Sequence, residues 1–172
     1  MRTEPYISSE DSRLLRDALK DYSGDSCLEI GAGNGGSLIE LRKRFGVVVG
    51  TDILLPGMGD WRSEGVNFVL ADRASCMRPS MFDLVAFNPP YLKAEVNDTA
   101  VDGGEDLQVS LGFLQEALRV VKKSGMILFL LNGEADIRAF ASLCRKSGFT
   151  LERVASRRLF FEELSVYFAR MA

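Results

Sequence analysis

The sequence predicts an α/β fold in one domain, a seven-stranded, mostly parallel sheet with helices on both faces and an antiparallel C-terminal hairpin. Three observations predict it. Strand-like and helix-like stretches alternate along most of the chain. The runs at 47–49 and 127–131 are apolar on both faces, as expected of strands at the centre of a sheet between two helical layers. Extended stretches at 150–157 and 164–169 indicate the closing hairpin.

The individual elements follow from local patterns. Ser8 or Ser9 can cap an N-terminal helix with one apolar face, which we expect to cover the sheet edge or the functional site. The other elements are expected at strands 26–30, 47–51, 66–70 and 84–87, helix 37–45, helix 107–121, strand 126–131 and helix 135–146. The short polar connection 57–65 replaces a full helix by a loop or a single turn.

Length and composition describe an ordinary globular protein. The 172 residues are 47% hydrophobic with mean hydropathy near zero, enough for one domain, which we divide into an N-terminal helical cap (1–24), a core (25–147) and the hairpin (148–172). No apolar run could span a bilayer and the start lacks a secretion signal, so we expect a cytoplasmic protein. Cys27, Cys76 and Cys144 are odd in number and lack a C-x-x-C pair, which favours reduced, mostly buried thiols and no metal site.

The charged residues restrict the possible chemistry. The chain has no histidine, which excludes the usual general base near pH 7 and the Ser-His and Cys-His nucleophile systems. A net charge of −3 and a pI near 5.1 give no overall attraction to phosphate backbones, so a nucleic-acid partner is not expected. Basic pairs such as Lys122-Lys123 and Arg157-Arg158 could still form local patches.

The most informative motif is Asn88-Pro89-Pro90-Tyr91, directly after the apolar run 84–87. If the Asn88 side-chain oxygen and the Pro89 carbonyl each accept one N–H, they fix a planar nitrogen with its lone pair directed at an electrophile. The prolines keep the turn rigid, and Tyr91 offers an aromatic wall. The motif therefore predicts methyl transfer to an amide or to an exocyclic base amine, although two prolines can also simply end a strand.

A glycine-rich turn follows the first strand and indicates a cofactor site. Gly31, Gly33 and Gly36 satisfy the G-x-G-x-x-G pattern, where the backbone can approach a ligand closely. Asp52, at the end of the second strand, is placed to bind ribose hydroxyls. These residues fit a nicotinamide dinucleotide and S-adenosylmethionine equally well.

Three further residues favour S-adenosylmethionine, which carries an amino acid and a sulfonium but no phosphate. Glu29 precedes the glycines, where its charge could hold the cofactor's amino group and attract the sulfonium. Asp72, at the end of the third strand, can accept from the adenine amino group while Ile53 and Arg73 flank the ring. With Asn88, these acids fall at the carboxyl ends of parallel strands, where open α/β sheets bind ligands.

Taken together, the chain resembles the class I S-adenosylmethionine-dependent methyltransferases that modify a glutamine of translation release factors, specifically the short eukaryotic and archaeal type. The similarity covers nearly the whole chain and lies at residues 6–12, 27–35, 51–53, 87–92, 103–104, 113–114 and 162–166. It implies transfer to the glutamine amide of a Gly-Gly-Gln motif, held by Asn88, Pro89, Pro90 and Tyr91. It also implies that the Ser12 hydroxyl lies near the cofactor, although Ser8 stands where the family has proline.

The resemblance also implies a protein partner. Bacterial members carry a helical domain in front that grips the release factor, whereas the short enzymes work with a small zinc-binding activator paired along the third-strand edge. Residues 66–70 would form that hydrophobic edge, so we expect a heterodimer. Two other functions stay open: methylation of an exocyclic base amine in RNA or DNA, and an inactive cofactor-binding scaffold.

Overall fold

The computed structural model describes residues 10–54, 65–89, 104–133, 135–158 and 163–172. The expected α/β fold is confirmed, with a seven-stranded mixed sheet that ends in an antiparallel hairpin. The elements are α1 (Glu10–Leu19), β1 (Gly24–Ile30), α2 (Gly36–Arg42), β2 (Phe45–Asp52), β3 (Asn67–Leu70), β4 (Phe82–Phe87), α3 (Gly104–Val120), β5 (Val121–Asn132), α4 (Ile137–Lys146), β6 (Phe149–Arg158) and β7 (Glu163–Met171).

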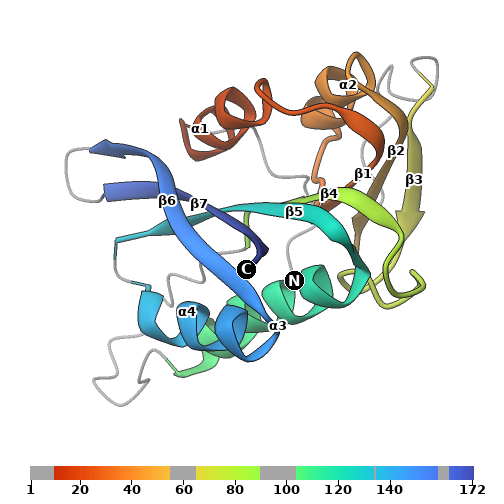
Figure 1. Cartoon of the computed structure of the whole chain (residues 1–172). Helices are drawn as coiled ribbons and strands as arrows, with labels where there is room; N and C mark the ends of the chain where they lie inside the picture. The colour runs from red at the N-terminus through yellow and green to blue at the C-terminus, as the bar shows by residue number, and fades with distance from the viewer. Residues whose placement is uncertain (1–9, 55–64, 90–103, 134, 159–162) are drawn as a thin grey trace.

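The strands lie in the order β3-β2-β1-β4-β5-β7-β6. The first five are parallel to their neighbours, and β7 pairs antiparallel with both β5 and β6 (Figure 1). The carboxyl ends of β3, β2, β1 and β4 consequently meet at one edge of the sheet, which is where the polar residues singled out in the sequence lie.

Two apolar clusters hold the helices to opposite faces of the sheet, with α1 and α2 on one side and α3 and α4 on the other (Figure 1). Leu14 and Leu15 of α1 and Leu38 of α2 belong to one cluster. Phe113 of α3 and Phe140 of α4 belong to the other. The amphipathic pattern of each helix thus matches the face that it covers.

The expected position of the second strand is wrong. The β5 run at 127–131 is fully buried at the heart of the sheet, as predicted, but β2 lies next to the sheet's edge and Val47 is 50% exposed. The expectation failed because an apolar run reports burial of a strand on average and carries no information about strand order.

Smaller differences have local causes. The helix expected to reach 45 ends at Arg42, and Phe45 opens β2 opposite Gly24. Val121, expected as the last residue of a helix, is instead the first residue of β5, because it pairs with Phe82 of β4. The three cysteines are free and mostly buried, as expected, with Cys27 and Cys144 buried and Cys76 exposed. The N-terminal cap candidates Ser8 and Ser9 and the connection 57–64 lie outside the described residues. Within the described residues, no helix is both long and apolar enough to cross a membrane.

Candidate active site at the carboxyl edge of the sheet

The fold brings the predicted site residues together at one edge. In the strand register, Ile30 lies opposite both Thr51 of β2 and Phe87 of β4, and Asp52 lies opposite Leu70 of β3. The four polar positions therefore all lie within two residues of the carboxyl ends of these strands. They lie, in order across the sheet, at Asp72, Asp52, Glu29 and Asn88.

The glycine-rich turn after β1 has the backbone conformation that its composition predicts. Gly31 and Gly33 have φ of 75° and 55°, where side chains other than glycine are rarely found. A Cβ atom at Gly31 would lie 3.2 Å from the Phe113 ring, whereas one at Gly33 would meet nothing within 4 Å. Gly31 is thus needed for packing against α3, and Gly33 leaves open space beside the turn.

Asp52 holds this turn in place. Its Oδ2 atom accepts a hydrogen bond from the Gly33 amide at 2.9 Å, and its Oδ1 accepts from the Leu54 amide at 3.0 Å. Each carboxylate oxygen can accept more than one hydrogen bond, so both can still receive ribose hydroxyls. Ile53, the next residue, is 67% exposed and offers an apolar surface for a flat ring.

Glu29 is the strongest indication of a positively charged ligand. Its side chain is buried, and its Oε2 atom has no hydrogen-bond partner. Burial raises the pKa of this carboxyl to about 7, and the charge of Asp52 acts in the same direction, while a hydrogen bond with Ser37 and the charge of Arg16 oppose the rise. A buried acceptor without a partner is unfavourable, and an ammonium group would satisfy it.

The same features disfavour a pyrophosphate. The amides that would bind it at the start of α2 already donate within the protein: Gly33 to Asp52, Gly35 to the Ala32 carbonyl and Gly36 to the Asn34 side chain. The neighbouring Glu29 carboxyl would also repel an anion. The chain's residues therefore fit S-adenosylmethionine, with an ammonium at Glu29 and ribose hydroxyls at Asp52, better than a dinucleotide.

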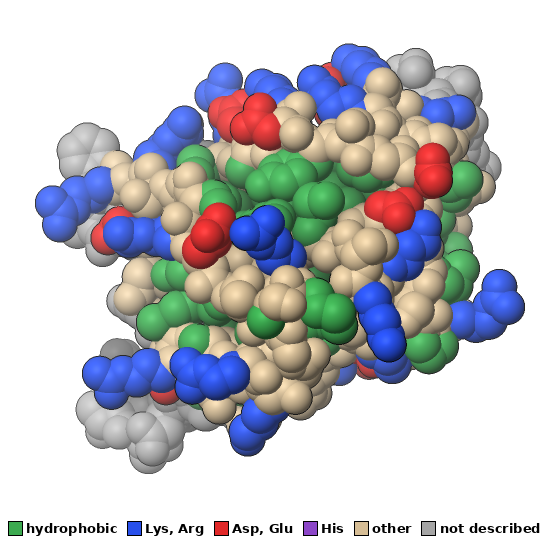
Figure 2. Space-filling view, in the orientation of Figure 1, with side chains coloured by type: hydrophobic (Ala, Val, Ile, Leu, Met, Phe, Trp, Pro, Cys, Tyr) green, Lys and Arg blue, Asp and Glu red, His purple; other side chains and the backbone are tan. Residues whose placement is uncertain are grey.

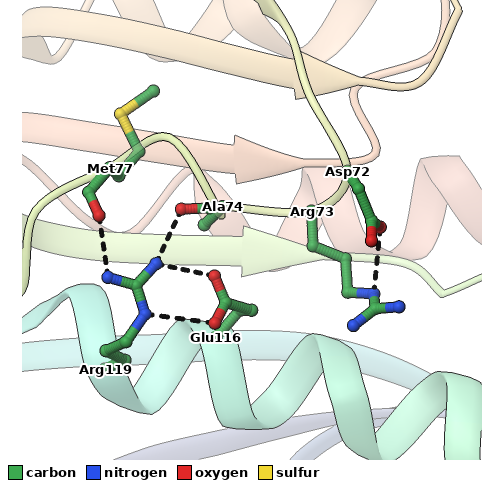
Figure 3. Close-up of polar contacts among 6 residues, drawn as sticks. All are labelled: Asp72, Arg73, Ala74, Met77, Glu116 and Arg119. Carbon is green, nitrogen blue, oxygen red and sulfur yellow. Dashed lines mark hydrogen bonds and ion pairs between the residues drawn. The ribbon is translucent and has the colours of Figure 1, made fainter.

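Asp72 and Arg73 lie on the turn that follows β3. The Arg73 Nε atom pairs with the Asp72 Oδ1 at 3.2 Å (Figure 3), and Asp72 is largely exposed. Arg73 has a φ of 49°, which is uncommon for a residue with a side chain. Both side chains are accessible to a ligand at the sheet edge.

The Asn88-Pro89 segment extends directly from β4. Asn88 is half-buried with its side-chain oxygen buried, and Pro89 is buried. Phe87 before them stacks on Phe129 with ring centroids 4.9 Å apart, which fixes the end of the strand. Pro90 and Tyr91 lie outside the described residues, so their expected roles stay predictions.

The sequence reasoning missed two residues near the site. Arg16 of α1, whose Nε donates to the Ser12 carbonyl, contributes positive charge at Glu29. The helical spacing of four residues from Ser12 was the available signal. Phe113 packs against Gly31 and lies 5.9 Å from the Phe87 ring, a contact that only the tertiary structure reveals.

Comparison with known proteins identifies relatives of this chain. No family model matches it. A candidate protein N5-glutamine methyltransferase from Methanocaldococcus jannaschii is 29% identical, over 96% of this chain and 91% of the relative. The release factor glutamine methyltransferase of Caulobacter vibrioides is 28% identical over 77% of this chain, which matches only 54% of that longer protein.

Solved structures point the same way. The E. cuniculi Mtq2-Trm112 complex, which methylates the eRF1 translation termination factor, contains a chain that matches with a TM-score of 0.75 and 25% identity over 97% of this chain and 98% of that one. A Burkholderia thailandensis N1-methyltransferase holding S-adenosylhomocysteine shares the fold, with a TM-score of 0.67 and 16% identity over 95% of this chain and 79% of that one. The chain therefore has the class I methyltransferase fold and is similar, over nearly its whole length, to protein N5-glutamine methyltransferases.

Proposed function

We propose that this protein transfers a methyl group from S-adenosylmethionine to the side-chain amide nitrogen of the glutamine in the Gly-Gly-Gln motif of a translation release factor. The observation that carries the proposal is the position of Asn88-Pro89. They extend β4 directly beside β1, whose Glu29 and glycine turn form the cofactor site. The names of the relatives, from an archaeon and a bacterium, support the same substrate.

The mechanism requires placement more than acid–base chemistry. When bound, S-adenosylmethionine supplies an electrophilic methyl group on a sulfonium. The Asn88 side-chain oxygen and the Pro89 carbonyl accept the two amide N–H groups, so the nitrogen lone pair faces away from them. Formation of the N–CH3 bond would be balanced by cleavage of the C–S bond of the sulfonium, and the nitrogen would then lose a proton to water. Because an amide carries no proton that must leave first, the absence of histidine is no obstacle.

Glu29 and Asp52 serve binding and orientation. Glu29 would hold the cofactor's ammonium in a site where water is excluded, which strengthens the interaction. Asp52 would hold the ribose and, through Gly33, the glycine turn itself. Asp72 would accept from the adenine amino group, with Ile53 and Arg73 on either side of the ring.

A partner protein would cover the edge at β3, and we propose a small zinc-binding activator in this role. Only six large hydrophobic residues are exposed within the described parts of the chain, and four of them lie on or directly after β2 and β3. Leu70 of β3 is 56% exposed on a strand that pairs only with β2 among the described strands. An edge of this kind favours pairing with another chain.

The edge can be tested with a matched pair of variants. Leu70→Asp places a charge at the β3 edge, and Val154→Asp places one on β6 at the opposite edge, where Val154 is 41% exposed. We expect Leu70→Asp to abolish co-purification with a co-expressed activator and Val154→Asp to leave it intact. Equal retention by both variants would refute the assignment of the interface to β3.

The proposed activity is tested by incubating a release factor with this protein and S-adenosylmethionine, with and without the activator, and locating any added methyl group by mass spectrometry. We expect one methyl group on the Gly-Gly-Gln glutamine. From this proposed substrate we infer that the protein works in the cytoplasm, where termination occurs. Transfer to RNA or DNA instead would support the base-amine alternative. Cofactor binding without transfer to either would identify an inactive scaffold.

Charge distribution argues against nucleic acid as the substrate. On the face in Figure 2, Lys and Arg side chains are dispersed and interrupted by acidic and apolar residues, so this face presents no continuous basic surface. The net charge of −3 agrees with this distribution. A nucleic-acid groove needs several aligned cations to neutralise phosphates.

A further inference from the structure

Helix α3 anchors the turn that carries Asp72 and Arg73 (Figure 3). The Arg119 guanidinium donates to the Ala74 and Met77 carbonyls, both at 2.7 Å, and is oriented by Glu116 at 2.6 and 3.1 Å. Glu116 also raises the pKa of Arg119, so the guanidinium stays charged. Charge-assisted bonds of this length hold the backbone after Arg73 firmly against the helix.

About two turns closer to the start of the helix than Arg119, the Arg73 side chain itself rests on α3 at Gly112. A Cβ atom built at Gly112 would lie 3.0 Å from the Arg73 Nη1 and 3.3 Å from its Cζ. The ion pair with Asp72 at 3.2 Å holds the other side of the guanidinium. The flat cation therefore lies directly against residue 112, and a side chain there would have to push it away by a few tenths of an ångström.

Glycine is unexpected at position 112 on grounds of helix propensity. Glycine is the poorest helix former after proline, and Gly112 lies inside α3 without the positive φ that would require it. Backbone conformation therefore does not explain the glycine, whereas the three atoms nearest to a Cβ at this position all belong to the Arg73 guanidinium group. Gly112 lowers the helix propensity of α3 but leaves room for the side chain of Arg73, which is consistent with a functional role for this glycine.

We propose that Gly112 is a positioning residue for the adenine subsite and acts through the guanidinium of Arg73. The inference rests on the proposed function, in which Arg73 flanks the adenine. A planar guanidinium stacks favourably on an aromatic ring, and the contact of Arg73 with α3 at Gly112 fixes the position of the guanidinium beside that ring. Because Arg119 fixes the backbone of the turn, a methyl group at residue 112 would displace the Arg73 side chain and leave the turn in place.

The test separates this role from a packing role because stability and binding should respond in opposite directions. In Gly112→Ala, we expect S-adenosylhomocysteine to bind about two- to fivefold more weakly by calorimetry, the loss expected for an exposed cation–π contact. The KM for S-adenosylmethionine should rise with kcat unchanged. The thermal midpoint should stay the same or increase, because alanine favours the helix. Gln115→Ala, at an exposed position of α3, is the control and should change neither quantity.

A double-mutant cycle with Arg73→Ala provides the decisive result. Once the guanidinium is gone, Gly112→Ala should cause no further loss of affinity. Unchanged affinity in Gly112→Ala, or an equal loss in the presence and absence of Arg73, would overturn the inference while leaving the proposed function intact. If the unmodified protein does not bind S-adenosylhomocysteine, the proposed function fails together with this inference.

Discussion

Replacing Glu29 by glutamine should change how the stability of the protein depends on pH. Burial, with a contribution from Asp52, raises the pKa of the Glu29 carboxyl from 4.5 to about 7 in the folded state. The folded protein therefore binds this proton more tightly than the unfolded chain does. The resulting stabilisation is fully present below pH 4.5 and is lost as the pH rises through 7. A difference of this size corresponds to about 3 kcal/mol in the free energy of unfolding.

Urea unfolding between pH 4 and 8 would measure this effect. The free energies of unfolding of Glu29→Gln and of the unmodified protein should depend differently on pH. Between pH 4 and pH 8, the difference between them should change by roughly 3 kcal/mol in favour of the variant. Glu40→Gln is the control, because Glu40 is partly exposed, pairs with Lys43 and has a lowered pKa. Parallel profiles for Glu29→Gln and the unmodified protein would refute the assignment of a raised pKa to Glu29.

Binding of the cofactor should favour the ionised form of the Glu29 carboxyl. An ammonium beside Glu29 favours the ionised carboxylate, so binding at pH 6 should release a proton and affinity for S-adenosylhomocysteine should increase as the pH approaches 7. Glu29→Gln should remove this dependence. If the variant shows the same pH dependence of binding, the ammonium does not lie at Glu29.

Three other substitutions test the division of roles. Asn88→Ala should abolish methyl transfer and leave the affinity for S-adenosylhomocysteine near normal, whereas Asp52→Ala should weaken that affinity about tenfold or more by loss of charge-assisted hydrogen bonds. Equal losses of binding, measured by calorimetry, would contradict the two roles. Gly50→Ala should destabilise the protein by about 1–3 kcal/mol in urea unfolding, because its Cβ would lie 2.5 Å from Leu38 Cδ1. Unchanged stability would show that α2 can move away from β2.

Much of the candidate site could be predicted because its residues obey a simple geometric rule. Parallel strands end at one edge, so polar residues that follow successive apolar runs must gather there whatever the order of the strands. Glu29, Asp52 and Asn88 needed only the positions of three strand ends. The glycine turn was equally local, since its positive φ angles concern single residues.

What could not be predicted depends on distant pairings. The position of β2 beside the edge strand cannot be predicted from its apolar run, so the exposure of Val47 was unexpected. The bonds from Arg119 to Ala74 and Met77 span 45 and 42 residues and follow no periodic pattern. Gly112 has no sequence signal beyond its low helix propensity, and its contact with Arg73 depends on how α3 crosses the sheet.

Helix α3 links three parts of the site that the sequence presents separately. Phe113 packs against the glycine turn at Gly31 and against Phe87, the residue before Asn88. Its neighbour Gly112 seats Arg73 beside the proposed adenine subsite. The proposed adenine contact, the glycine turn and the strand end proposed to bind the amide thus all contact the same helix. Transfer between a fixed nitrogen and a fixed methyl group depends on their separation and alignment, so the position of this helix sets the geometry on which the reaction depends.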